Sequence, residues 1–249
     1  MSKWIAHEVR HRDGGINFIS FPYAGGSPST FAPWKSEIPE TINFFPVLYP
    51  GRELRKSDPM PKTVDLFAKQ FVDENQELFQ NDFILFGHCT GTLLAYEVLL
   101  EVRRRFGKEP LYLLASGSES PRFLMTRERE MEKRGASDEE MIDMMVEYEL
   151  VDPDTARSVL FQKYYLPIYR MDLNMLSTYR FTSHEKLHCP IRVMYGKDDR
   201  TLRKEAVQDW EAFSDDPVEF KLFQGKHFYF AEDKMPLLGY VKELIEPFT

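Results

Sequence analysis

Short apolar runs alternate with amphipathic segments along most of the chain. The apolar runs are nearly continuous, which is typical of strands buried on both faces of a parallel sheet. The segments between them carry apolar residues at helical spacing. This alternation predicts an α/β fold with a mostly parallel central sheet flanked by helices, and functional sites at the carboxyl ends of the strands. The expected strands are residues 16–22, 42–50, 82–87, 111–117, 191–196 and 218–223, and the expected helices are residues 30–37, 63–80, 91–105, 204–213 and 235–246.

One region interrupts the alternation. From about residue 119 to 180 the pattern predicts helices and no strand, and the segment is rich in Met, Leu, Tyr and Phe. Ser137 and Glu140 form a capping box before one helix, and Asp152 with Pro153 begins another. The apolar side chains either pack these helices against the body or line a substrate channel. Because the insertion follows a strand end, we expect a helical lid at 119–180 within one domain, 1–249.

The apolar run NDFILF is followed directly by GHCTG, residues 87–91. A residue on a sharp turn from strand to helix needs small neighbours two positions before and after it, and Gly87 and Gly91 provide them. Cys89 would then stand at the N-terminus of the next helix, where unpaired amides stabilise a thiolate or an oxyanion. The pentapeptide by itself also fits a buried, unreactive cysteine.

A nucleophile on such a turn needs a base within hydrogen-bonding reach and an acid that orients the base. The downstream histidines are His184, His188 and His227. The first two precede a strand in a polar segment, so we expect them at the surface. His227 follows the last expected strand and is the candidate base. The turn GKDDR supplies the acid, which is Asp199 if the last residue of a G-x-x-D turn is used, with Asp198 as the alternative.

Composition and charge fit a single-domain enzyme. A chain of 249 residues with 43% hydrophobic content can bury one large core. The net charge of −8 argues against general nucleic-acid binding and against an anionic membrane surface. The apolar runs are too short to span a membrane, and the first residues lack the apolar core of a secretory signal. Two cysteines are too few for a disulfide framework. We therefore expect a cytoplasmic protein.

Five motifs follow one another along the chain: FPYAGGS (21–27), YPGRE (49–53), GHCTG with LLAYE after it, the GKDD turn and the GKHFYF loop. In this order the chain resembles, from about residue 18 to 230, the type II thioesterases that accompany nonribosomal peptide and polyketide synthetases. The resemblance implies an α/β-hydrolase fold with a helical lid. It also implies hydrolysis of acyl, aminoacyl or peptidyl thioesters from the phosphopantetheine of carrier proteins in natural-product biosynthesis.

The resemblance further implies a role for each site residue. Cys89 would be the nucleophile, Asp199 the acid and His227 the base of a Cys-His-Asp triad. The backbone amides of Ala24 and Thr90 would form the oxyanion hole. No metal and no cofactor of the protein's own is implied, because the substrate arrives on its carrier protein. We expect the protein to act as a monomer.

The chain departs from this family at the nucleophile, because most members carry serine, often in GHSMG, where this chain has Cys89. Three explanations are open: a native cysteine hydrolase, a transferase evolved from one, or a serine enzyme altered deliberately. Serine takes the acyl group downhill to an ester, whereas cysteine forms a nearly isoenergetic thioester that stays reactive toward amines. Acyl transfer or cyclisation onto an amine is therefore an alternative function. A non-catalytic module that binds carrier proteins or acyl ligands is another.

Docking of a carrier protein raises an electrostatic question. Carrier proteins are normally acidic and this chain is acidic overall, so recognition requires a local basic surface. The candidates are Arg52 and Arg55 beside the YPGRE turn, and Arg122 and Arg127 at the start of the expected lid.

Overall fold

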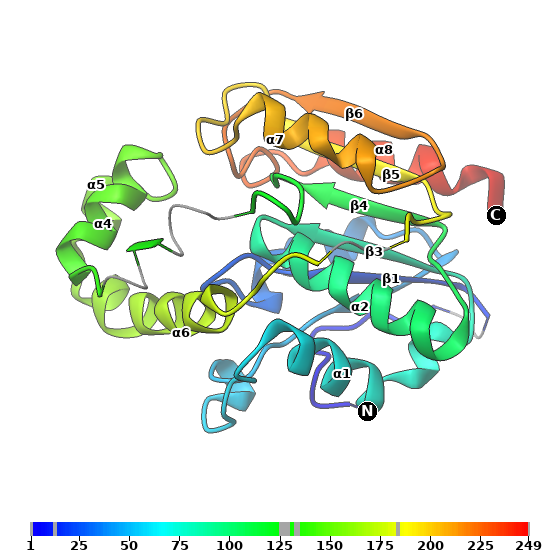
Figure 1. Ribbon diagram of the computed structural model, residues 1–249, viewed down its shortest axis with the longest axis horizontal. Helices are drawn as coiled ribbons and strands as arrows, with labels where there is room; N and C mark the ends of the chain where they lie inside the picture. The colour runs from blue at the N-terminus through cyan, green and yellow to red at the C-terminus, as the bar shows by residue number, and fades with distance from the viewer. Residues whose placement is uncertain (1, 12–13, 125–129, 132–134, 183–184, 249) are drawn as a thin grey trace.

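A parallel sheet forms the centre of the molecule (Figure 1). The computed structural model describes residues 2–11, 14–124, 130–131, 135–182 and 185–248. The strands are β1 (Ile16–Phe21), β2 (Ile42–Pro46), β3 (Phe83–His88), β4 (Tyr112–Ser116), β5 (Ile191–Gly196) and β6 (Val218–Phe223). Their order across the sheet is β2-β1-β3-β4-β5-β6, and every neighbouring pair is parallel. The expected α/β fold is therefore confirmed.

Helices cover both faces of this sheet, which explains why β1 to β5 are almost entirely buried and mostly apolar, whereas the edge strand β6 alternates and is only partly buried. The described part of the chain contains the α-helices α1 (Val64–Glu74), α2 (Thr90–Phe106), α4 (Asp138–Glu147), α5 (Pro153–Ala156), α6 (Leu166–Ser177), α7 (Lys204–Gln208) and α8 (Met235–Ile245). On β3, Phe83 and Leu85 join one hydrophobic core with α1 and α2, whereas Ile84 and Phe86 join a second core with α8. None of the described helices is long and apolar enough to cross a bilayer.

Two of the expected helices are shorter than predicted and continue as 3-10 turns. The helix expected over 63–80 is capped by Thr63 but ends at Glu74. Asn75 follows, and its side chain donates to the carbonyl oxygen of Phe71 at 2.6 Å, in competition with the helical hydrogen bonds. The 3-10 segments are Gln76–Phe79 after α1 and Asp209–Ala212 after α7, and the helix expected over 30–37 is itself a 3-10 helix, Pro28–Glu37.

The segment between β4 and β5 contains α4, α5 and α6, and its described residues form no named strand. The predicted capping box is confirmed: Ser137 accepts from the Glu140 amide, and the Glu140 carboxylate accepts from the Ser137 amide. Asp152 caps α5 as predicted, although this helix has only 4 residues. Figure 1 shows α4, α5 and α6 together, beyond the end of the sheet to which the arrowheads of β4 and β6 point.

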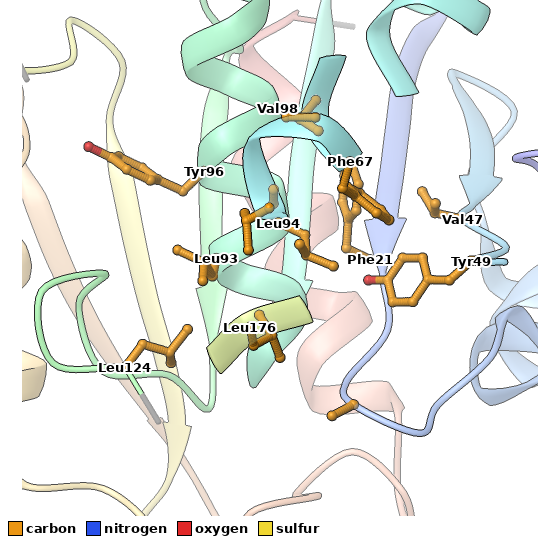
Figure 2. Packing of buried hydrophobic residues seen from close by; sticks show 14 of the residues in the cluster. Phe21, Val47, Tyr49, Phe67, Leu93, Leu94, Tyr96, Val98, Leu124 and Leu176 are labelled. Carbon is orange, nitrogen blue, oxygen red and sulfur yellow. The ribbon is translucent and has the colours of Figure 1, made fainter. Parts of the chain in front are cut away.

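This insertion packs on the body of the protein through α6. Leu176 of α6 and Leu124 belong to the same buried cluster as Leu93 of α2 (Figure 2). Just after α6, the hydroxyl of Tyr179 donates to the carboxylate of Glu97 on α2 at 2.8 Å. The insertion is thus anchored to the helix that follows the GHCTG motif.

Candidate active site

Cys89 lies on a sharp turn between β3 and α2. Its backbone has φ 54° and ψ −122°, a conformation that residues other than glycine rarely adopt. A Cβ on Gly87 would lie 2.4 Å from backbone atoms of Gly91 and Thr92, and a Cβ on Gly91 would lie 2.2 Å from the carbonyl oxygen of Phe21. Both glycines are therefore required for the close approach of these backbones. The turn has the geometry of a nucleophile elbow.

The elbow places Cys89 at the N-terminus of α2. Thr90 is the first residue of this 17-residue helix. The amide of Cys89 donates to the carbonyl oxygen of Ser116, at the end of β4, at 2.8 Å. The last turn of the helix carries three arginines, which complement its dipole at the other end. Negative charge that develops beside Cys89 would lie at the positive end of the helix dipole.

His227 and Asp199 form a hydrogen-bonded pair. Nδ1 of His227 lies 2.8 Å from Oδ2 of Asp199, and both side chains are buried. The other carboxylate oxygen of Asp199 accepts from the amide and the hydroxyl of Thr201, at 2.9 and 2.7 Å. Burial raises the pKa of Asp199, but hydrogen bonds and charge from His227, with the hydrogen bonds from Thr201, outweigh it and lower the pKa. Asp199 is therefore held as a carboxylate that orients the imidazole.

The second ring nitrogen of His227, Nε2, is the one that does not bind Asp199. Nε2 is buried, and no described residue makes a hydrogen bond to it in the usual geometry. Burial lowers the pKa of His227, but the negative charge of Cys89 and the interactions of the ring with the side chains of Asp199 and Cys89 outweigh it and raise the pKa to about 10. An imidazolium at this position stabilises a thiolate, and the neutral ring can accept a proton from water.

The other candidates from the sequence lie elsewhere. Asp198 is exposed, and His188 is exposed with its amide bonded to Glu109. His184 lies outside the described residues. Cys189 is buried, and burial raises the pKa of its thiol. Among the described candidates, Asp199 is hydrogen-bonded to His227, His227 lines the same pocket as Cys89, and the other candidates lie outside this group. No group of three or more His, Cys, Asp or Glu in the described part of the chain could hold a metal ion.

Two further groups beside the triad were not predicted. Thr201 bonds to both members of the His–Asp pair, since its hydroxyl also lies 3.1 Å from His227 Nδ1. The ring of His88 lies 4.8 Å from that of His227, and its Nδ1 is 2.9 Å from the hydroxyl of Ser116. Burial and the charge of His227 lower the pKa of His88 well below its usual value, so this ring is neutral. The sequence signal that could have identified His88 was its position between a buried strand and the expected nucleophile.

The loop after β1 lies against the elbow. A Cβ on Gly91 would lie 2.6 Å from the carbonyl oxygen of Pro22, so the loop and the start of α2 are in direct contact. Ala24 is buried and lines the same pocket as Cys89. Thr90 is buried in the first turn of α2. The two segments that carry the expected oxyanion donors therefore meet beside the cysteine.

Cys89 opens into a small pocket under the insertion. The pocket has a volume of about 60 Å³, and its lining includes Met145 and Tyr165 from the insertion. A larger pocket of about 570 Å³ adjoins it and shares Tyr23 and Phe228 with it. Aromatic and aliphatic side chains predominate in both, so an apolar acyl group on the cysteine would find complementary surroundings.

Arg52 and Arg55 are buried, so the prediction that they form a docking surface is wrong. Their side chains are 2% and 6% exposed. A buried guanidinium needs a partner, and Arg52 has one in Asp172 of α6. Arg122 remains a candidate because its side chain is 46% exposed. Arg127 lies outside the described residues.

The parallel sheet and the strained turn at Cys89 define the α/β-hydrolase class. The model of the thioesterase domain family matches residues 17–246, and the chain therefore belongs to this family. It is 27% identical to RedJ, a thioesterase from the prodiginine pathway of Streptomyces coelicolor, with a TM-score of 0.80 over 92% of this chain and 90% of RedJ. It is 25% identical to the type II thioesterase BorB from the borrelidin biosynthetic cluster, with a TM-score of 0.82 over 98% of both chains. The gramicidin S biosynthesis protein GrsT of Aneurinibacillus migulanus is 22% identical over 241 residues, which are 97% of this chain and 93% of GrsT.

Proposed function

We propose that the protein is a type II thioesterase that hydrolyses acyl, aminoacyl or peptidyl thioesters on the phosphopantetheine of carrier proteins, through an S-acyl intermediate on Cys89. The observation that carries this proposal is the His227–Asp199 pair beside a cysteine on a strained turn at a helix N-terminus. Family membership supports a thioester substrate. The pathways named for BorB, RedJ and GrsT support a role in natural-product biosynthesis.

The proposed first half-reaction transfers the acyl group to the protein. Sγ of Cys89 attacks the thioester carbonyl carbon, and an electron pair of the C=O bond moves to the oxygen. The amides of Ala24 and Thr90 donate to this oxyanion at the positive end of α2. When the oxyanion collapses, the bond to the pantetheine sulfur breaks, and His227 donates its proton to the leaving thiolate.

The proposed second half-reaction releases the acid. His227, now neutral, accepts a proton from a water molecule, and the oxygen of this water attacks the S-acyl carbon. Asp199 holds the ring and stabilises the imidazolium that forms. Collapse of the second oxyanion breaks the bond to Sγ, which leaves the free acid and restores the pair of Cys89 and His227.

A cysteine in place of the usual serine favours one second candidate, transfer or cyclisation of the acyl group onto an amine. The S-acyl intermediate keeps the reactivity of a thioester, so an amine could replace water in the second half-reaction. A non-catalytic binding module would need the pocket but not the buried His–Asp pair, so we rank it below both enzymes.

The surroundings of the site complete the proposal. Residues 119–180 act as a lid over the pocket, within one domain that spans 1–249, and the protein works as a monomer in the cytoplasm. The contribution of Met145 and Tyr165 to the Cys89 pocket supports the lid. The protein uses no metal or cofactor of its own in this mechanism.

The proposed function is tested by detection of the covalent S-acyl intermediate. Incubation with acyl-pantetheine should increase the intact mass by one acyl group, and peptide mapping should place it on Cys89. Cys89→Ala should abolish the label, whereas Cys189→Ala, which removes the buried second cysteine, should retain it. Labelling that survives Cys89→Ala unchanged would exclude the mechanism.

The fate of the intermediate separates the two enzymes. After removal of excess donor, loss of the acyl group in buffer alone identifies a hydrolase, whereas an intermediate that persists until an amine is added identifies a transferase. Cys89→Ser tests whether the site also activates an alcohol. We expect loss in buffer, because the other family motifs follow the hydrolases.

A further inference from the structure

The loop that carries Ala24 is held by side chains of the helical insertion. The peptide group between Ala24 and Gly25 is bound at both polar ends. The hydroxyl of Tyr165 donates to its carbonyl oxygen at 3.1 Å, and its N–H donates to Oδ2 of Asp172 at 2.8 Å. A Cβ on Gly25 would lie 2.6 Å from the Tyr165 ring, so the insertion packs directly on the loop. Tyr165 and Asp172 belong to one continuous helical segment, 161–177.

Arg52 completes this arrangement from the body of the protein. Its Nη1 donates to the carbonyl oxygen of Gly26 at 2.6 Å and to Oδ2 of Asp172 at 2.9 Å, and its Nη2 donates to Oδ1 of Asp172. The two side chains are 2% and 3% exposed. Tyr49, whose hydroxyl points toward the end of β1 (Figure 2), donates to the carbonyl oxygen of Pro22 at 2.8 Å. Because the side chains of Arg52 and Asp172 are almost completely shielded from solvent, the loop conformation depends on the position of Asp172.

We propose that Asp172 is a positioning residue for the oxyanion hole, and that it makes catalysis depend on the seated position of α6. The inference rests on the proposed function, because that function assigns the Ala24 amide to the oxyanion. The Ala24 N–H belongs to the peptide directly before the one that Asp172 and Tyr165 hold. If α6 moved away, the peptide group between Ala24 and Gly25 would be free to rotate, because residues 25 and 26 are both glycine. A substrate admitted by movement of the insertion would meet a complete site only after the insertion returned.

Two reactions of Cys89 test this role. Acylation by acyl-pantetheine forms an oxyanion, whereas alkylation by iodoacetamide does not. Asp172→Ala should slow acylation by about 10- to 100-fold, because removal of an oxyanion donor costs about 10²- to 10³-fold and displacement costs less. The alkylation rate and its pH profile should stay unchanged. A role confined to the thiol or to folding would affect both reactions alike.

Two further variants separate positioning from stability. Asp172→Ala leaves the buried charge of Arg52 without its partner, so this variant should also melt at a lower temperature. Arg52→Met combined with Asp172→Leu replaces the pair by apolar side chains, and should recover the melting temperature but not the acylation rate. Tyr179→Phe is the matched control, because it removes a hydrogen bond between the insertion and the body without touching the loop. It should acylate at the wild-type rate.

The outcomes distinguish this inference from the proposed function. If the wild-type protein is alkylated but never acylated at Cys89, the proposed function fails and the inference fails with it. If the wild-type protein is acylated and Asp172→Ala is acylated equally fast, the inference alone is wrong. It is also wrong if the double variant regains acylation together with its melting temperature, or if Tyr179→Phe is slowed as much as Asp172→Ala.

Discussion

Glu97 on α2 is a buried carboxyl group whose ionisation should cost folding free energy at neutral pH. The residue is 8% exposed, and its carboxylate accepts a hydrogen bond from Tyr179. Burial raises its pKa, the bond from Tyr179 opposes this and the charge of Asp65 adds to it, so that the pKa is about 7 instead of 4.5. Between pH 4.5 and about 7, the unfolded chain releases the proton of Glu97 more easily than the folded protein does. The free energy of unfolding therefore falls as the pH rises through this range.

Glu97→Gln removes this cost and keeps an oxygen that can accept from Tyr179. At 1.36 kcal/mol per pKa unit, the difference between 4.5 and about 7 corresponds to about 3 kcal/mol. The stability gained by the variant over the wild type, measured as the increase in the free energy of unfolding, should therefore be larger at about pH 8 than at about pH 4, by up to about 3 kcal/mol. Urea denaturation followed by circular dichroism at both pH values measures this difference.

Glu101 on the same helix provides the matched control. It is 7% exposed, but hydrogen bonds from Arg104 outweigh burial and, with Arg105, lower its pKa. A carboxyl group whose pKa is lowered in the folded state stabilises the protein at pH values above its ordinary pKa. This stabilisation is lost as the pH falls through the lowered pKa. Glu101→Gln should therefore lose stability at about pH 8 and lose less at about pH 4, the opposite trend to Glu97→Gln. If the Glu97→Gln difference is the same at both pH values, or has the same sign of trend as Glu101→Gln, the reasoning is refuted.

Further substitutions test the site. His227→Ala should lower kcat by about 10²- to 10⁴-fold in acyl-pantetheine hydrolysis, because it removes the base. Asp199→Asn should cost less, and the exposed Asp198→Asn should leave kcat unchanged; a larger loss for Asp198→Asn would reverse the assignment of the acid. Gly91→Ala should destabilise by about 3 kcal/mol or more in urea denaturation, because its Cβ would meet backbone at 2.2 Å. Arg122→Glu should raise KM for an acyl-carrier protein and leave acyl-pantetheine hydrolysis unchanged; equal loss on both substrates would exclude a docking role.

The sequence predicted best those elements whose formation depends on the residue pattern within a single segment. Mostly apolar runs predicted the strands of the sheet interior, because a strand covered on both faces must be largely apolar. The edge strand β6 was also predicted, although its sequence VEFKLF alternates with charged residues and is only partly buried. Gly87 helped to predict the turn at Cys89 because its close neighbours, Gly91 and Thr92, lie only a few positions away. Gly91, in contrast, is required by a tertiary contact with Phe21 and Pro22 at the end of β1. Helix ends were predicted less well, as at Asn75, where one side-chain hydrogen bond decides where the helix stops.

In the candidate site, too, some features could be predicted from the sequence and others depend on tertiary contacts. The order of Cys89, Asp199 and His227 and their places after three strands were readable, because the carboxyl ends of parallel strands share one edge of the sheet. The choice between adjacent aspartates was a weaker inference from turn shape, and the hydrogen bond from Asp199 to the imidazole is a tertiary contact.

Arg52 shows most clearly what only the tertiary structure decided. From its place in a polar turn it was expected to be exposed, yet it is buried against Asp172, 120 positions further along the chain. Charged residues are normally at the surface, so no local pattern marks one that will be paired inside. The sequence by itself determined the sheet, the turn at Cys89 and the order of the candidate triad. The tertiary structure alone decided which distant charges meet, and so how the helical insertion contacts the loop at the proposed oxyanion hole.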